Sequence, residues 1–178
     1  ATARRHDLSI RAALGASRLL VVCTPGRAKD ATRFGAPVYA DAKEHVPRAT
    51  VDDARRHAAG VDAILAFGGG SAIGLAKALA LETTALVVAI PTTYSGSEMT
   101  PVYGITDGGD KRTGRDERAR PRLVFYDRDL FASLPRATAT ASLWNALAHA
   151  VEALWVDPSD RATHAVANEA RELIVRSL

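Results

Sequence analysis

The sequence predicts an α/β fold built on a parallel β-sheet, followed by the start of an all-helical domain. Two observations carry this prediction. Between residues 18 and 134, short apolar runs of strand length alternate with segments whose apolar residues recur at helical spacing. After Thr138 no strand pattern returns, and two helices are predicted at 140–154 and 161–178. We therefore expect an α/β domain at 1–134 and the beginning of an incomplete helical domain at 135–178.

The composition is that of a globular protein. Of its 178 residues, 47% are hydrophobic and 24% are charged, with a net charge of +3. The apolar runs are far shorter than the roughly 20 residues that cross a bilayer, and no signal-peptide pattern is present. We therefore expect a cytoplasmic protein with no membrane partner. Arginines spread along the chain favour anionic small molecules over nucleic acid as ligands.

Cys23 is the only cysteine and is predicted to be a buried thiol.

Most elements follow from local patterns. Helices are predicted at 6–15, 27–34 and 51–59, the last with Thr50 and Asp53 as a capping box. The residues Asp157, Pro158 and Ser159 are expected to separate the two C-terminal helices. Strands are predicted at 18–23, 37–40 and 123–126, an extended segment at 101–106 and a turn at 107–109. Residues 111–122 form a polar run. Its arginines are interpreted as a solvated face, and the alternative is a clamp for a dicarboxylate or a phosphate.

The stretch from Ala63 to Leu81 contains the strongest candidate binding site. A buried strand at 63–67 is stopped by three glycines, and a helix is predicted to follow from Ser71. The backbone N–H groups of Gly69, Gly70 and Ser71 would lack intrahelical partners and face the positive end of the helix dipole, which makes an anion site. A purely structural turn is the alternative, because Gly74 falls one residue too late for the G-x-G-x-x-G fingerprint, and the residues after Lys77 do not match a P-loop.

A second polar loop follows the next predicted strand, at 85–90. That strand is expected to break at Pro91, after which come five hydroxyl side chains, those of Thr92, Thr93, Tyr94, Ser95 and Ser97. In a parallel sheet, ligands gather outside the carboxyl ends of the strands, so both loops should lie at one edge. A capping or turn role for these hydroxyls is the alternative reading.

One face of the first C-terminal helix carries a candidate for chemistry. Asn145, His149 and Glu152 stand at i, i+4 and i+7 and therefore share a face. His149 is the best-placed polar group, although a histidine on a helix can also be an ordinary core or surface residue. Asn145 and His149 could form half of a metal site, but an amide oxygen is a poor ligand beside carboxylate or imidazole. Most of the other four histidines, His6, His45, His57 and His164, are expected to be ordinary surface residues.

Three segments together resemble a known family. They are GGGSAIGLAKALAL, AIPTTYSGSEMTPVYGITDGGDKRTGRD and NALAHAVEALW. They look like the iron-containing alcohol dehydrogenase superfamily and, within it, the maleylacetate reductases. The resemblance runs from about Arg18 to the end. It implies a Rossmann-like nucleotide-binding domain, a helical domain, an active site in the cleft between them and a homodimeric parent enzyme. Members are much longer, so the chain is expected to be truncated.

The resemblance also implies roles for particular residues. Gly69, Gly70 and Ser71 match the pyrophosphate-binding turn, and Lys111 matches a lysine that reaches the ribose hydroxyls. Thr24 stands where many NAD-preferring members carry an aspartate, so NADH and NADPH are both expected to be accepted. The residues that match the loop contacting the adenine side and the ribose are Thr92, Thr93 and Ser97.

The implied reaction is hydride transfer from NADH or NADPH to the carbon–carbon double bond of maleylacetate, a small dicarboxylate. The product is 3-oxoadipate, in the breakdown of aromatic compounds. Metal-dependent members carry aspartates where this chain has Gly74 and Asn145, so no tightly bound metal is expected. His149, helped by Asn145, is then expected to stabilise the enolate. The alternatives are metal-dependent alcohol oxidation and a non-catalytic nucleotide-binding fragment.

Overall fold

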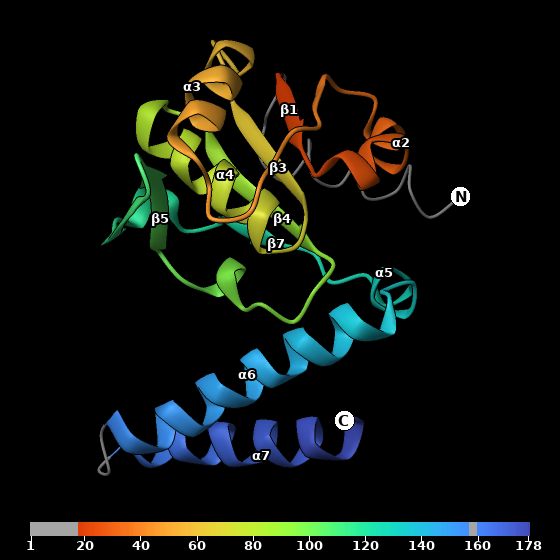
Figure 1. Ribbon diagram of the computed structural model, residues 1–178, viewed down its shortest axis with the longest axis vertical. Coiled ribbons are helices and arrows are strands. Elements are labelled where there is room, and N and C mark those ends of the chain that lie inside the picture. Colours follow the sequence, from red (N-terminus) through yellow and green to blue (C-terminus); the bar gives the residue numbers. More distant parts are fainter. Residues whose placement is uncertain (1–17, 157–159) are drawn as a thin grey trace. The chain divides into compact units, whose positions relative to one another are not determined.

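Figure 1 shows the computed structural model of the chain, which describes residues 18–156 and 160–178. The predicted helix at 6–15 and the predicted separator at 157–159 lie outside these residues. The chain forms two compact units. The first unit runs to Thr92 and resumes over Ser97–Asp127, whereas the second consists of Thr93–Gly96 and Arg128–Leu178.

A parallel sheet forms the centre of the first unit, which confirms the predicted fold class. Its strand order is β2-β1-β3-β4-β7, and every neighbouring pair is parallel. After β1 the chain adds β2 on one side and β3 on the other, so the order changes direction between β1 and β3. The strands are β1 (Leu19–Val22), β2 (Val38–Tyr39), β3 (Ala63–Gly68), β4 (Leu86–Pro91) and β7 (Leu123–Val124). Pro91 ends β4 by pairing with Gly68, so the strand extends one residue beyond the predicted break.

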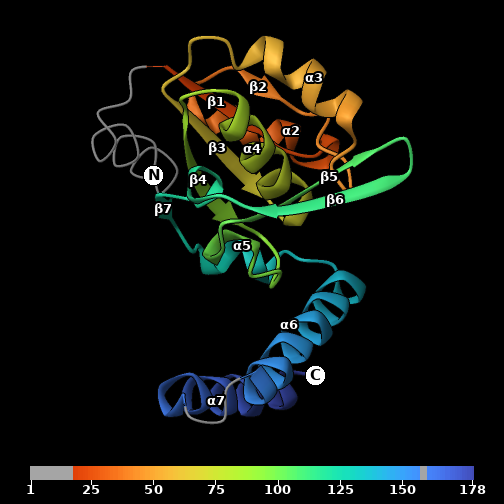
Figure 2. The same cartoon turned by 90° about the vertical axis from the view of Figure 1, so that its left-hand side faces the viewer.

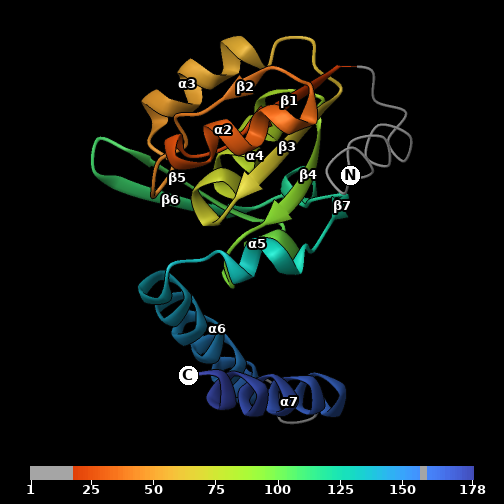
Figure 3. The ribbon, with the colours of Figure 1, turned by 90° about the vertical axis from the view of Figure 1, so that its right-hand side faces the viewer.

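Helices cover both faces of this sheet. Ile64 and Ala66 point to the face covered by α3 (Arg48–His57) and α4 (Gly70–Glu82), where they join the main apolar cluster. Figure 2 shows these two helices in front of the sheet, and Figure 3 shows α2 (Ala28–Ala31) in front of the opposite face. Phe67 lies on that opposite face, and its ring centroid is 5.2 Å from that of Phe34. Because β3 is buried along its whole length, its sequence is apolar without alternation.

An antiparallel hairpin follows β4. Its strands are β5 (Val102–Asp107) and β6 (Asp110–Arg115), joined by Gly108 and Gly109 with φ of 56° and 94°. The predicted extended segment and turn are confirmed, but the interpretation of residues 111–115 as part of a polar run missed β6. Most residues of β6 are exposed, so this strand lacks the apolar alternation by which a strand is usually found.

The predicted capping box of α3 is wrong. The helix begins at Arg48, its N-cap is Pro47, and no side chain caps it. Thr50 is therefore buried within the first turn. Asp53 instead accepts a hydrogen bond of 2.9 Å from the Tyr39 hydroxyl, which joins α3 to β2. The extended backbone at Pro47 starts the helix without help from a side-chain cap.

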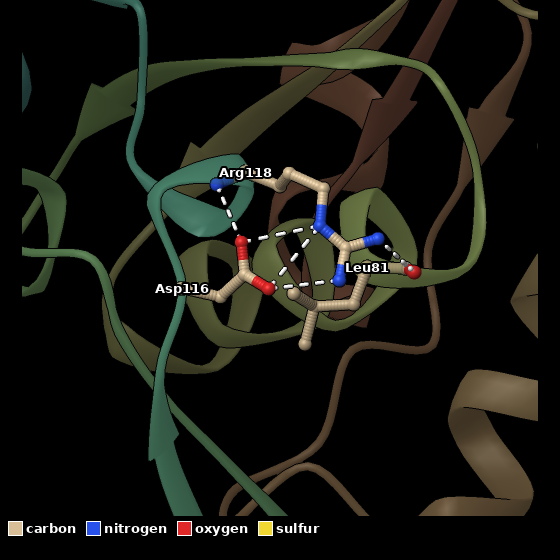
Figure 4. A network of polar contacts seen from close by, with 3 residues as sticks. All are labelled: Leu81, Asp116 and Arg118. Carbon is tan, nitrogen blue, oxygen red and sulfur yellow. Dashed lines mark hydrogen bonds and ion pairs between the residues drawn. The ribbon is translucent and has the colours of Figure 1, made fainter.

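One arginine of the polar run holds the end of α4 in place (Figure 4). Asp116 accepts hydrogen bonds from the Arg118 backbone N–H and guanidinium, and Arg118 Nη1 donates to the Leu81 carbonyl at 3.1 Å. A cation at the last turn of a helix meets the negative end of its dipole. The interpretation of the arginines as a solvated face holds for Arg118, whose side chain is 62% exposed. Its hydrogen bond to Leu81 also ties the end of α4 to the turn η4 (Glu117–Ala119).

The second unit is helical, and both predicted C-terminal helices are confirmed. It contains α5 (Arg128–Ala132), α6 (Arg136–Val156) and α7 (Arg161–Ser177), and α6 packs along α7. Asp160 caps α7 by accepting from the Thr163 N–H at 2.9 Å. Among the residues that the structure describes, no helix is long and apolar enough to cross a membrane.

The loop before α3 approaches α4 unusually closely. His45 and Val46 have φ of 60° and 49°, a region that a β-branched residue such as valine rarely adopts. Two hydrogen bonds from Thr106 hold this backbone, one from its N–H to the Val46 carbonyl at 3.0 Å and one from its hydroxyl to the His45 carbonyl at 2.8 Å. The buried Val46 side chain lies against Gly74, where a Cβ atom would be only 2.7 Å from Val46 Cγ2.

We therefore expect Gly74→Ala to destabilise the first unit. The added methyl group would overpack the contact with Val46, which costs about 1–3 kcal/mol in a well-packed core. Urea unfolding monitored by circular dichroism measures this change. Gly26→Ala is the matched control, since a Cβ at Gly26 would meet nothing within 4 Å. Equal unfolding free energies for the two variants would show that Val46 does not constrain residue 74.

Candidate functional site

The glycine turn between β3 and α4 leaves backbone groups open to a ligand. Gly68 has φ of 152°, a conformation that other residues rarely adopt, and a Cβ there would lie 3.1 Å from the Ala72 Cβ. The N-cap of α4 is Gly69, which has no side chain and so makes no side-chain capping bond. The N–H groups of the first turn therefore receive no cap, while the 13-residue helix directs its positive dipole end toward the same place.

A cavity of about 380 Å³ opens beside this turn. One face of α4 forms its floor, because Gly70, Gly74 and Lys77 stand at i, i+4 and i+7. Gly70 has no side chain on this face, so a ligand can approach the backbone at the start of the helix, whereas Val46 packs against Gly74. The other walls come from the loop before α3, from the residues after the hydroxyl loop and from the hairpin, through Glu44, His45, Val46, Ser97, Val102, Tyr103, Gly104 and Lys111.

The structure brings four of the predicted cofactor-binding residues together at this cavity. Gly70 and Ser71 come from the start of α4, Ser97 from the β4–β5 connection and Lys111 from the second residue of β6. These residues are up to 41 positions apart in the sequence (70 to 111). They meet because the sheet places the segments after β3 and β4 at one edge and the hairpin brings Lys111 to the same cavity.

The remaining predicted residues of the first unit lie at the same edge of the sheet. Val22 pairs with Ala66, so Thr24 follows β1 at the level where the glycine turn follows β3. Thr24 is extended and makes no capping bond with its side chain. The Thr92 N–H donates to the Gly68 carbonyl at 3.1 Å, and Thr92 is only 3% exposed. Both loops therefore meet at the carboxyl ends of β1, β3 and β4, next to the point where strand order reverses.

The hydroxyl loop is divided between the two units. Thr93 belongs to the second unit, together with Tyr94, Ser95 and Gly96. Within that unit the Tyr94 N–H donates to the Ser142 hydroxyl at 3.4 Å, and the Tyr94 ring lies 5.1 Å from that of Phe131. The middle of the loop therefore packs on the helical unit, whereas Thr92 and Ser97 stay with the sheet.

The candidate catalytic pair lies on α6. Asn145 and His149 are both exposed and one helical turn apart. His149 Nδ1 is 3.5 Å from Glu152 Oε2, and the histidine side chain is 64% exposed. His149 also lines a cavity of about 540 Å³ between α6 and α7 whose other walls are alanines, Thr163, Val166 and Ile174. Within residues 18–156 and 160–178, no three His, Cys, Asp or Glu side chains are grouped so that they could hold a metal ion.

Two features of the cavity were missed from the sequence. The first is the loop at Glu44–Val46, whose place at the cavity depends on contacts distant in sequence. The second is Lys77, which is fully buried on the cavity floor. Burial is the largest influence on this ammonium and lowers its pKa to about 8. The sequence does show a charged residue in the middle of the apolar segment of α4, which could have indicated a buried lysine. Lys77 was compared only with the lysine of a P-loop, which it does not match.

Three other titratable residues, Cys23, Glu98 and Tyr126, do not line this cavity. Cys23 is fully buried, as predicted, and burial raises the pKa of its thiol. Tyr126 is 56% exposed, but its hydroxyl donates to Glu98 at 2.8 Å. The shielding of this hydroxyl from water and the hydrogen bond raise the pKa of the phenol to about 12. Glu98 itself is 4% exposed in the turn at Ser97–Met99, and among the described residues its Oε2 has no hydrogen-bond partner.

Comparisons with known proteins agree with this architecture. The chain is 45% identical over 174 residues to maleylacetate reductase 2 of Cupriavidus pinatubonensis, covering 93% of this chain and 48% of that one. The crystal structure of maleylacetate reductase from Agrobacterium tumefaciens superposes with a TM-score of 0.85 at 39% identity, over 93% of this chain and 50% of that one. The crystal structure of the iron-containing alcohol dehydrogenase of Thermotoga maritima superposes with a TM-score of 0.83 at 26% identity, over 97% of this chain and 56% of that one.

The chain thus spans about half the length of the curated relatives that it matches. The sequence model of the iron-containing alcohol dehydrogenase family matches residues 8–128, which include the whole sheet, the glycine turn and the hairpin. The family resemblance stated from the three sequence segments is therefore confirmed. The chain belongs to the iron-containing alcohol dehydrogenase family.

Proposed function

We propose that this chain carries the cofactor-binding part of an NAD(P)H-dependent maleylacetate reductase. The observation that carries the proposal is the cavity at the glycine turn, where an uncapped helix N-terminus and Lys111 lie on the walls of one space. The family is one of dehydrogenases, and relatives named maleylacetate reductase are 40–46% identical to this chain. The proposed division is a nucleotide-binding domain at 1–134 and part of a helical domain at 135–178.

In this proposal the chain's residues hold a dinucleotide by its charged and polar groups. The N–H groups of Gly69, Gly70 and Ser71 donate to the pyrophosphate, which the dipole of α4 also favours. Thr24 lies beside the adenosine ribose and leaves room for a 2′-phosphate. Lys111 donates to ribose hydroxyls, and the hydroxyls of Thr92, Thr93 and Ser97 contact the rest of the cofactor. The reduced nicotinamide supplies the hydride.

The proposed substrate is maleylacetate, which would be reduced to 3-oxoadipate. Hydride addition to its carbon–carbon double bond moves negative charge to the ketone oxygen, and a donor must stabilise that charge until a proton arrives. His149 is proposed as this donor, with Asn145 as an amide donor one turn away. Both side chains are exposed on α6 and open to a ligand.

The family name implies a metal, and the donors on α6 do not fit one well. A tightly held iron or zinc requires several imidazole, thiolate or carboxylate ligands. The candidate face of α6 offers an amide at Asn145 and one imidazole at His149, and Glu152 is engaged with that imidazole. We therefore derive no step through a metal and propose that reduction continues after chelation. A dimeric parent enzyme and a cytoplasmic location also belong to this proposal.

Ser71→Asp should weaken NADH binding at least tenfold without destabilising the chain. A carboxylate in the first turn of α4 interacts favourably with the helix dipole, by about 0.3–1 kcal/mol, but repels a pyrophosphate at the same N–H groups. NADH fluorescence titration measures the affinity. Ser71→Asn, of the same shape but neutral, is the matched control. Equal affinities for the two variants would place the pyrophosphate elsewhere.

Thr24→Asp should convert a dual preference into a preference for NADH. The new carboxylate would bond the ribose hydroxyls of NADH but repel a 2′-phosphate, which should reduce NADPH affinity roughly 10- to 100-fold relative to NADH. Titration of each cofactor against Thr24→Asp and the neutral Thr24→Asn measures this ratio. An unchanged ratio would remove Thr24 from the adenosine ribose site.

His149→Ala should lower maleylacetate-dependent NADH oxidation by about two orders of magnitude or more, because a positioned proton donor contributes about that much. The assay follows absorbance at the NADH band under saturating cofactor. Cofactor affinity should stay unchanged, since the glycine turn is intact. Unchanged turnover would exclude His149 from the mechanism. NADH binding without any oxidation by the unmodified chain would instead favour a non-catalytic nucleotide-binding module.

A further inference from the structure

Lys77 is a buried cation on the cavity floor that no role proposed above uses. It is 0% exposed in α4, where nearly all neighbouring residues of the helix are alanine, leucine or isoleucine. Its Nζ donates to the Val102 carbonyl at 2.7 Å and to the Thr100 hydroxyl at 3.3 Å. Thr100 lies between Ser97 and the hairpin, and Val102 is the first residue of β5, so the lysine links the helix to the opposite cavity wall.

Keeping an ammonium in this place is unfavourable for folding alone. Removing a charge from water costs several kcal/mol unless it is well paired, and an apolar side chain of similar size would avoid that cost. The charged groups that influence Lys77 are the Glu98 carboxylate, which favours the charged form, and the Arg120 guanidinium, which opposes it. Burial, Glu98 and Arg120 together lower the Lys77 pKa to about 8, and burial is the largest of the three causes. The charge is therefore only partly compensated within the chain.

The geometry of α4 relates this cation to the proposed anion site. Gly70, Gly74 and Lys77 share the helix face that forms the cavity floor, and the seven-residue separation between Gly70 and Lys77 corresponds to about 10 Å along the axis. Positive potential thus comes from the helix N-terminus at one end of the floor and from the ammonium at the other. The remaining charged or titratable side chains at the cavity are those of Glu44, His45, Tyr103 and Lys111.

We propose that Lys77 is a positioning residue of the dinucleotide site: it fixes the Thr100–Val102 wall against α4 and gives the cavity floor the positive potential that a bound diphosphate compensates. This inference rests on the proposed function, because it takes the cavity to be the cofactor site. The inference gives a role to Lys77, whose neighbouring residues do not fit the P-loop pattern. The lysine acts on the anion through the cavity, at a distance, and not through contact with the phosphates.

The first test measures NADH affinity of the unmodified chain and of Lys77→Met between pH 6.5 and 9.5. The ammonium is protonated below its pKa, so the affinity of the unmodified chain should fall as the pH rises through about 8. Lys77→Met should bind roughly tenfold more weakly at pH 7 and should lack this pH dependence. Its midpoint of thermal unfolding should be unchanged or higher, because the buried charge is gone. Lys29→Met removes an exposed lysine as the control and should bind like the unmodified chain.

The second test needs no variant. The chain contains four lysines, Lys29, Lys43, Lys77 and Lys111, so their ¹³Cε signals can be resolved by NMR in the lysine-labelled chain. Addition of NADH should raise the Lys77 pKa measured in this way, since a nearby anion favours the charged form.

The outcomes separate this inference from the proposed function. No NADH binding by the unmodified chain would overturn the proposed function and the inference with it. Binding whose pH profile is the same in Lys77→Met, or a Lys77 pKa that NADH does not move, would overturn the inference alone. Parallel losses of affinity and of thermal stability in Lys77→Met, with the pH dependence retained, would show that the lysine is only structural.

Discussion

The parallel pairing of β3 with β1 on one side and β4 on the other determines where the candidate site lies. The register sets Gly68 opposite Pro91 and Ala66 opposite Val22. The loops that follow all three strands are thereby placed at one edge of the sheet, beside the reversal of strand order between β1 and β3. Because β3 is completely buried, a one-residue shift in its register would move each side chain to the opposite buried face and disrupt the packing there, so the position of the glycine turn is fixed.

The contact between Val46 and Gly74 changes the interpretation of that glycine. From the sequence, Gly74 was taken with Asn145 as a sign that the chemistry proceeds without a metal. In the structure, residue 74 has no room for a Cβ because Val46 lies against it. This packing accounts for glycine at the position by itself. The proposal of metal-independent reduction therefore depends on Asn145, where an amide stands on the exposed face of α6.

The same contact links backbone strain to the shape of the cavity. His45 and Val46 adopt positive φ, and such conformations persist only where surrounding contacts determine them. Thr106 supplies two of those contacts from the hairpin, and Gly74 supplies the space for the Val46 side chain. The loop before α3, the helix α4 and the hairpin thus form one cavity whose three walls depend on each other.

The sequence was sufficient for those parts of the fold that local patterns determine. The strand at Ala63, the glycine turn and the helix after it were predicted within one residue at each end, because burial and helical spacing are visible in the apolar residues themselves. The strand β6 was missed because it is solvent-exposed and carries no apolar alternation. The start of α3 was missed because Pro47, and not a hydroxyl cap, begins the helix.

The candidate site was predictable as a set of loops but not as a cavity. Gly70, Ser71, Ser97 and Lys111 were named from the sequence, and they meet as expected. Lys77 and the loop at Glu44–Val46 were not named, since their places depend on tertiary contacts with Val102, Thr106 and Gly74. A buried lysine in an apolar helix is nevertheless a signal that sequence reasoning can use.

A crystal structure of the chain grown with saturating NADH would show whether the glycine turn holds the diphosphate of a nicotinamide dinucleotide, as we propose. We expect density for the diphosphate within hydrogen-bonding distance of the Gly70 and Ser71 N–H groups, with the adenosine ribose beside Thr24 and the other ribose near Lys111. Cofactor density at another place, with the glycine turn free of ligand, would contradict the proposal.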